Sequence, residues 1–410
     1  MKLLFICSMT ITLLFVGCSS LNKSYNDKND SHASRVISSL PSEDRLLTAE
    51  EVYAQYKRKP LSYEEKELLS VLDKYDIEKK PKRSAERFHL PLAHLAKILE
   101  MNNDIDELID VLISSDTRND LFRLQALIRI YKKQKNKNAQ LFEQLMLKIK
   151  GLEDAIGKYS EKMAFLKFAK TIGADQSSVI PYIEKEAEHF KDSLKRELQN
   201  EWSQSGDRND GVQSFIEIMS EVKWMKYKKD KKFVIKRIQN MIKKVSRTEY
   251  DMSALQEGIH EYRRQVRWTL LYVQSLQGLI NFKQGAGSST NDDLNSSLAD
   301  LEKLNNKYLR FNTYESEKHP VKISFPYYMK LTDIVKNIGD LKDLGENFHY
   351  VIEAYVHSGK ITDQHQAHAQ VVALAKQKDI LELDVTSRMT LIYNEINDLQ
   401  LLQLIEAELD

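Results

Sequence analysis

Cysteine is nearly absent from this chain. Its 410 residues include two cysteines, Cys7 and Cys18, both within the first twenty positions. If Cys7 leaves with a signal peptide and Cys18 carries lipid, the mature body has no thiol. This excludes disulfides, cysteine-ligated metals and a cysteine nucleophile from the body.

Catalytic and cofactor motifs are also absent. The sequence has no P-loop, no Gly-x-Ser-x-Gly and no HExxH. We therefore predict binding without turnover: the protein is not an enzyme, has no catalytic residues and needs no cofactor. The pairs His89 with His94 and His365 with His368 could suggest metal ligands, but no cysteine or third acidic ligand accompanies them. We predict no metal site and interpret these residues as surface or core histidines.

Glycine and proline are scarce, with 13 and 7 residues, and net charge is close to zero. The 61 basic and 60 acidic residues give +1, so no global field draws the protein to nucleic acid, which we do not expect as a partner. Hydrophobic residues make up 42% and charged residues 30%, an ordinary composition for a soluble helical protein with a sizeable core. Any affinity for anions must be local.

The longest apolar run lies at the N-terminus and is too short to span a bilayer. It follows Lys2, covers residues 3–16 and ends at Gly17-Cys18. This pattern is typical of a signal peptide and resembles a bacterial lipoprotein signal. The resemblance implies removal of residues 1–17, acylation of Cys18 and a lipid anchor in the bacterial cell envelope, with Ser19 indicating the outer membrane. A plain secretory signal followed by a free Cys18 is the alternative.

Three segments flank the main body of the chain. Residues 18–45 are polar and lack apolar periodicity, so we expect a flexible tether behind the acylated cysteine. Residues 46–89 are predicted to form a helical extension, because two capping boxes, Thr48–Glu51 and Ser62–Glu65, open helical patterns there. Residues 377–410 are predicted to form a C-terminal helix.

The main body, residues 90–376, reads as a helical bundle. Its long proline-free intervals hold amphipathic runs with few β-branched alternations, and we find no credible strand pair. The predicted fold class is all-α.

Residues 259 to 273 carry two stripes at helical spacing. The apolar stripe consists of Ile259, Tyr262, Val266, Leu270 and Val273. The basic stripe consists of His260, Arg263, Arg264 and Arg267, about a quarter turn away at 100° per residue. Guanidinium forks suit phosphate oxygens, and a protonated His260 would add a donor at mildly acidic pH. The alternative is a solvated surface on which Glu257 and Glu261 neutralise His260 and Arg264.

A faint internal repeat surrounds this helix. Ile149-x-x-Leu152-x-x-x-Ile156-Gly157 matches Leu331-x-x-Ile334-x-x-x-Ile338-Gly339, with acids Glu161 and Asp343 four residues after the glycines. A basic-faced helix precedes each copy: Phe122-x-x-Gln125-x-x-x-Arg129 and His260-x-x-Arg263-x-x-x-Arg267. Two copies predict a duplicated helical bundle, with two similar sub-bundles packed face to face.

The second of these patterns resembles the CHAD (conserved histidine α-helical domain) family, over roughly residues 90 to 375. That family consists of duplicated helical bundles that bind inorganic polyphosphate through a basic cleft, so the resemblance implies such a cleft here. The chain departs from the family at Phe122 and Gln125, where His and Arg would stand, and at Trp268, where another basic residue is usual. Half of the cationic cleft is therefore in doubt.

Two further basic segments accompany the arginine helix. The run from Lys223 to Arg247 is interrupted only by the acid Asp230, and a stripe follows Arg129. Solvated charge is the alternative for both. The residues predicted to bind the polyanion are His260, Arg263, Arg264, Arg267, Lys232, Lys236, Arg129, Lys132 and Lys133.

The sequence thus predicts a membrane-anchored lipoprotein that binds polyphosphate or another phosphate-rich polyanion without catalysis. The alternative is a structural or adaptor lipoprotein that has kept a degenerate bundle, has lost the polyanion and binds a protein partner.

Overall fold

The computed structural model describes residues 63–75, 82–101, 104–115, 117–134, 138–202, 211–276, 278–283, 320–382 and 384–409. All of them belong to one unit, Leu46–Asp410. The predicted signal peptide (1–17), Cys18, the tether (18–45) and the first capping box lie outside the described residues.

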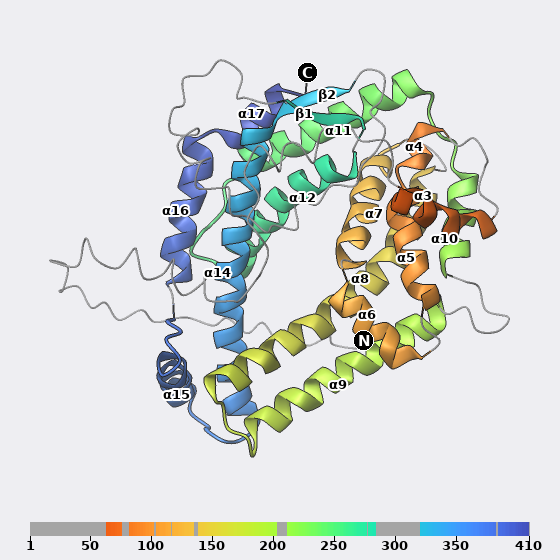
Figure 1. The fold of residues 1–410 in the computed structure, drawn as a ribbon. Coiled ribbons are helices and arrows are strands. Elements are labelled where there is room, and N and C mark those ends of the chain that lie inside the picture. The colour runs from red at the N-terminus through yellow and green to blue at the C-terminus, as the bar shows by residue number, and fades with distance from the viewer. Residues whose placement is uncertain are drawn as a thin grey trace, which may run out of the picture. The chain divides into compact units, whose positions relative to one another are not determined.

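The described residues are mostly helical, which confirms the coarse prediction (Figure 1). In chain order the elements are α3 (Tyr63–Ser70), η1 (Val71–Lys74), α4 (Arg83–Glu86), α5 (His89–Met101), α6 (Ile105–Ser114), α7 (Thr117–Tyr131), α8 (Asn138–Ile172), α9 (Val179–Glu197), η2 (Leu198–Trp202), α10 (Gly211–Glu221), α11 (Tyr227–Arg247), η3 (Leu255–His260), α12 (Glu261–Ser275), β1 (Ile280–Lys283), β2 (Val321–Ser324), α14 (Phe325–His357), α15 (Gln364–Lys376), α16 (Val385–Asp398) and α17 (Leu401–Ala407). Here η1 is a 3₁₀-helix, and η2 and η3 are π-helices.

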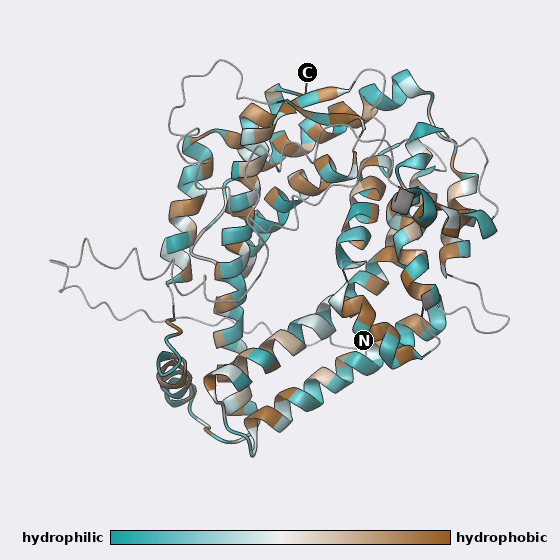
Figure 2. Ribbon diagram, viewed as in Figure 1, coloured by the Kyte–Doolittle hydropathy of each residue, from teal (hydrophilic) through white to brown (hydrophobic). Residues whose placement is uncertain are grey.

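Two hydrophobic clusters form the core. The larger gathers side chains from α5, α7, α11, α12 and the C-terminal helices, and the smaller gathers them from α9 and α15. The long helices α8 and α14 contribute to both: α8 enters the larger cluster up to Tyr159 and the smaller from Phe165. Apolar and polar residues alternate along most helices (Figure 2), as expected where one face packs and the other meets water.

The part of the N-terminal extension that is described packs into the larger cluster. Leu72, Ala85 and Phe88 are buried there beside residues of α5. The first described helix, α3, begins directly after Ser62, where the second capping box predicted a helix start.

A short parallel sheet corrects the prediction that no strands pair. Ile280 pairs with Val321 and Lys283 with Ser324, so β1 and β2 run side by side for four residues. Four residues are too few to show a period-2 pattern, and β2 leads directly into α14. Sequence periodicity therefore indicates only helix α14 in this region.

The C-terminal segment contains two helices where one was predicted. Gln400 adopts a left-handed backbone conformation (φ 51°) between α16 and α17. This turn lets Leu401, Leu402 and Ile405 of α17 enter the larger cluster.

A buried polar network fixes the start of α11. Arg87 Nη1 lies 2.8 Å from Asp230 Oδ2, and the Tyr131 hydroxyl donates to Asp230 Oδ1 at 3.0 Å. Arg87 and Asp230 are 3% and 1% exposed. Asp230, the one acid in the lysine run, is thus a buried partner of an arginine from the turn between α4 and α5.

No described helix has both the length and the apolar character to cross a bilayer.

Candidate functional site

The helix at 259–273 folds in the predicted phase. Ile259, Tyr262, Val266, Leu270 and Val273 are all at most 1% exposed. The basic residues lie beside this stripe: His260, Arg263 and Arg267 are half-buried, and Arg264 is exposed. The apolar stripe therefore anchors the helix, and the cations stand at the edge of the core.

These cations face a cavity of about 450 Å³ formed by four helical segments. Ligand pockets commonly have volumes of about 300–1,000 Å³. The charged residues that line it are Arg118 and Arg129 of α7, Lys150, Glu153, Asp154 and Glu161 of α8, Arg263, Arg264 and Arg267 of α12, and Lys342, Asp343 and Glu346 of α14. His260 lines it as well. Among the lining residues that the structure describes, seven cationic side chains face five carboxylates, so the cavity has a cationic excess.

The structure brings only part of the predicted set together. His260, Arg263, Arg264, Arg267 and Arg129 all line the cavity. Lys132, Lys133, Lys232 and Lys236 do not. Lys132 pairs with Glu143 of α8, and Lys133 is exposed.

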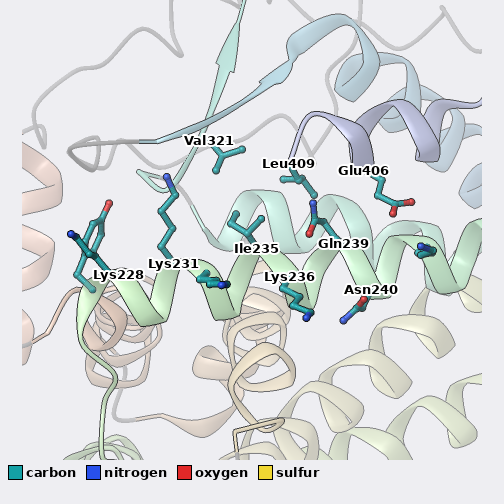
Figure 3. A pocket seen from close by; sticks show the side chains of 12 residues that line it. Lys228, Lys231, Ile235, Lys236, Gln239, Asn240, Val321, Glu406 and Leu409 are labelled. Atoms are coloured by element: carbon teal, nitrogen blue, oxygen red, sulfur yellow. The ribbon is translucent and has the colours of Figure 1, made fainter.

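Lys232 and Lys236 instead line a separate hollow of about 750 Å³ along α11 (Figure 3). Figure 3 shows Lys231 and Lys236 on α11, with Val321 of β2 and Leu409 near α17 beside the helix. The residues predicted to bind the polyanion therefore lie on two separate surfaces. Sequence spacing could not give the direction in which the basic face of α11 points.

Arg263 lies flat against α14 because Gly339 has no side chain. A Cβ on Gly339 would lie 2.8 Å from Arg263 Nη2. The same arrangement occurs on α8, where a Cβ on Gly157 would lie 2.6 Å from Arg118 Nη2. The two glycines picked out by the repeat are each covered by a guanidinium.

The aromatic residues that depart from the CHAD pattern support arginines. The Arg267 guanidinium lies over the Phe122 ring, 4.5 Å from Cζ to the centroid, and Arg129 lies over the Trp268 ring at 4.0 Å. Phe122 and Trp268 meet edge to face with centroids 6.2 Å apart. Cation–π contacts of this kind hold guanidiniums in place without neutralising them. Phe122 and Trp268 therefore help to hold two of the guanidiniums of the cavity in place.

Several cations of the cavity are already paired with carboxylates. Arg118 Nε and Nη2 lie 3.1 and 3.0 Å from Glu153 Oε1, and Lys150 Nζ lies 3.3 Å from Glu153 Oε2. Lys342 pairs with Glu346, and Arg264 pairs with Glu261, as the alternative interpretation of Arg264 expected. These pairs reduce the positive field of the cavity.

Three arginine or histidine nitrogens at the cavity lack a hydrogen-bond partner within the described parts of the chain. They are Nε of Arg129, Nε of Arg263 and Nδ1 of His260, and all three atoms are buried. A buried polar atom without a partner costs about 1–3 kcal/mol. An anion held in the cavity would supply acceptors for them.

The surroundings of His260 bear on the prediction that this side chain becomes a second donor at mildly acidic pH. Burial lowers the pKa of this imidazole, and the cations Lys342, Arg263 and Arg264 lower it further, against the opposing effect of Glu346. His260 is therefore neutral near neutral pH and donates at most one ring N–H.

Sequence reasoning missed Arg118, Lys150, Glu153 and Lys342. Arg118 stands one helical turn before Phe122 and Lys342 three residues after Gly339, so both followed from the repeat once its helices were extended. Glu153 left no signal of its own, because a glutamate within an amphipathic helix reads as solvated surface.

His94 and His368, each from one of the two histidine pairs, have carboxylate partners. The structure places no three His, Cys, Asp or Glu side chains together as metal ligands in the ranges it describes. His94 contacts Asp120, and His368 Nε2 lies 3.0 Å from Glu382 Oε1.

The chain matches no protein-family model, no curated protein and no solved structure.

Proposed function

We propose that this protein binds a phosphate-rich polyanion in the cavity between α7, α8, α12 and α14, and does not transform it. The observation that carries the proposal is the convergence of Arg129, Arg263 and Arg267 on one hollow from two separate helices. Arginine binds phosphate oxygens through planar, charge-assisted hydrogen bonds.

The state of Arg263 supports the proposal most directly. No carboxylate among the described residues forms an ion pair with it, and its buried Nε has no partner. A half-buried guanidinium without a counter-charge is costly, and an anionic ligand offsets that cost.

The two guanidinium-covered glycines favour a duplicated bundle of CHAD type. In each contact an arginine covers a glycine of the next long helix: Arg118 of α7 covers Gly157 of α8, and Arg263 of α12 covers Gly339 of α14. The arginines are not in equivalent positions of the repeat, since Gln125 is the counterpart of Arg263 and Arg118 lies seven residues earlier. We infer a diverged duplication, and inorganic polyphosphate is the ligand that the family resemblance implies.

The N-terminal sequence adds the cellular context. A lipoprotein signal ending at Cys18 would place the cavity in the cell envelope, tethered to the outer membrane by lipid on that cysteine. Loss of membrane association in a Cys18→Ser variant, measured by fractionation of the producing cell, tests this part.

Calorimetric titration of the full chain with polyphosphate tests the binding proposal. We expect binding that weakens as salt rises and that is lost in Arg263→Ala/Arg267→Ala. The matched control is Lys232→Ala/Lys236→Ala, which removes the same two charges from the separate hollow on α11. Equal losses in both variants would mean that general charge, and not the cavity, binds the anion.

The ion pairs within the cavity favour a second candidate function, that of a structural or adaptor protein. Arg118, Lys150 and Lys342 have carboxylate partners, so part of the cavity is stable without a ligand. A stable protein complex recovered by pull-down, unaffected by added polyphosphate, would support this candidate.

A further inference from the structure

The two guanidinium–glycine contacts differ in their counter-charges. Four residues before Gly157, one helical turn along α8, stands Glu153; four residues before Gly339, on α14, stands Val335. Val335 is fully buried and apolar. The arginine over Gly157 therefore has a carboxylate beside it, whereas the arginine over Gly339 has none among the described residues.

Glu153 contacts three polar side chains on the α7–α8 side of the cavity. Its side chain is 6% exposed and contacts Arg118 and Lys150. Gln125 Nε2 also donates to Glu153 Oε2, at 3.5 Å. These are the donors that a bound phosphate would use, and a carboxylate of the protein already holds them.

Burial raises the pKa of the Glu153 carboxyl, but Arg118 and Lys150 outweigh burial and lower it overall. Glu153 therefore stays ionised at neutral pH.

We propose that Glu153 acts as a built-in counter-anion that closes one side of the cavity, so that the cavity takes a single terminal phosphate group at Arg263 and Arg129. This inference rests on the function proposed above and narrows its ligand class. A terminal phosphate, whether at the end of a polyphosphate chain or in a phosphate monoester, carries close to two negative charges near neutral pH, whereas a phosphate inside a chain carries about one.

The carboxylates that line the cavity favour the binding of a single phosphate group over a long chain. Asp154, Glu161, Asp343 and Glu346 line it together with Glu153. Further phosphates of a long chain threaded through the cavity would approach these carboxylates and be repelled. A single compact dianion approaches fewer of these carboxylates than a threaded chain does.

The test is a chain-length series with the full chain. Pyrophosphate, tripolyphosphate and long polyphosphate are titrated at equal concentrations of chains. We expect dissociation constants per chain that agree within about threefold, because one end binds in each case. An affinity that rises steeply with chain length in the wild-type protein would overturn the inference, and this measurement needs no variant.

Glu153→Gln supplies the second arm. The amide keeps the shape of the side chain but releases Arg118 and Lys150 from their counter-charge, so affinity for long polyphosphate should rise about tenfold. Glu143→Gln, which removes one charge from an exposed part of the same helix, is the matched control. A folded Glu153→Gln protein with unchanged affinity would contradict the inference.

The failures of the two proposals are distinguishable. If neither the wild-type protein nor Glu153→Gln binds any of the three anions, the proposed function is wrong and this inference falls with it. If the wild-type protein binds all three but increasingly with length, only this inference is wrong.

Discussion

Arg129 lies over the face of Trp268, with 4.0 Å from the guanidinium carbon to the ring centroid. The two residues come from α7 and α12, so the contact joins the helices that supply the cavity's arginines. Tyr272 opposes the lowering of the Arg129 pKa that burial causes. Trp268, which stands where the CHAD resemblance would place a basic residue, thus positions the basic residue Arg129.

A double-mutant cycle measures this contact. Trp268→Leu keeps an apolar side chain at the buried position but removes the π face, and Arg129→Met removes the charge. We expect a coupling energy of about 0.5–2 kcal/mol between the two changes in urea unfolding. Additive effects of the two substitutions would show that the stacking contributes nothing to stability.

Gly339→Ala should displace Arg263. The added methyl group would lie 2.8 Å from Nη2, so the guanidinium must move off α14. Because Ala is the better helix former by about 1 kcal/mol, we expect stability to be kept while anion affinity falls. Calorimetry with pyrophosphate reports the affinity, and thermal unfolding reports the stability.

The control for that substitution lies on the same helix. A Cβ at Gly345 would face Val385 at 3.2 Å and would not meet a cation. Gly345→Ala should leave anion binding as it is, and a loss equal to that of Gly339→Ala would contradict the role of the Arg263 contact.

Asp230→Ala should be strongly destabilising. It removes the carboxylate that pairs with the buried Arg87, for which we expect a loss of about 3–5 kcal/mol in the free energy of unfolding. Lys170→Ala breaks an ion pair of the same 2.8 Å length between exposed side chains, Lys170 and Glu184, and should cost at most about 1 kcal/mol. Similar losses in the two variants, measured by urea unfolding, would show that burial does not set the importance of these pairs.

His260 should make stability fall on acidification. Its pKa is lowered in the folded protein, chiefly by burial. Between the folded and the unfolded pKa, the unfolded chain binds the proton and the folded protein does not, so the free energy of unfolding decreases as pH falls through the unfolded value.

The pH dependence is measured by unfolding curves at a series of pH values. His260→Gln should reduce the slope below neutral pH, whereas His349→Gln, which changes an exposed histidine of α14, serves as the comparison. An identical slope in wild-type and His260→Gln protein would exclude His260 as its source.

The sequence was informative wherever one helix determined the outcome. The apolar stripe from Ile259 to Val273 is buried as predicted, and the adjacent Arg263 and Arg267 reach the cavity. Val234 and Ile238 of α11, which are four residues apart, are buried too. Helical phase is a local property, so it can be read from spacing alone.

The relations between helices could not be read in that way. Lys236 and Arg263 are both predicted to bind the polyanion, but they line different hollows. Glu153 is as polar in sequence as any exposed glutamate, and its burial depends on contacts with Arg118 and Gln125 of another helix, α7. Tertiary contacts of this kind decide which charges remain available to a ligand.

The cavity lies where the two long helices, α8 and α14, pass from one hydrophobic cluster to the other. Along α8 the lining residues bracket the point where one packing cluster ends at Tyr159 and the next begins at Phe165, and on α14 they lie between Ile338 and Phe348. An anion bound at this junction would contact the helices that carry both clusters, so we expect the anion-bound protein to unfold in one step on heating. Without the anion, we expect the cluster that contains α9 and α15 to unfold first.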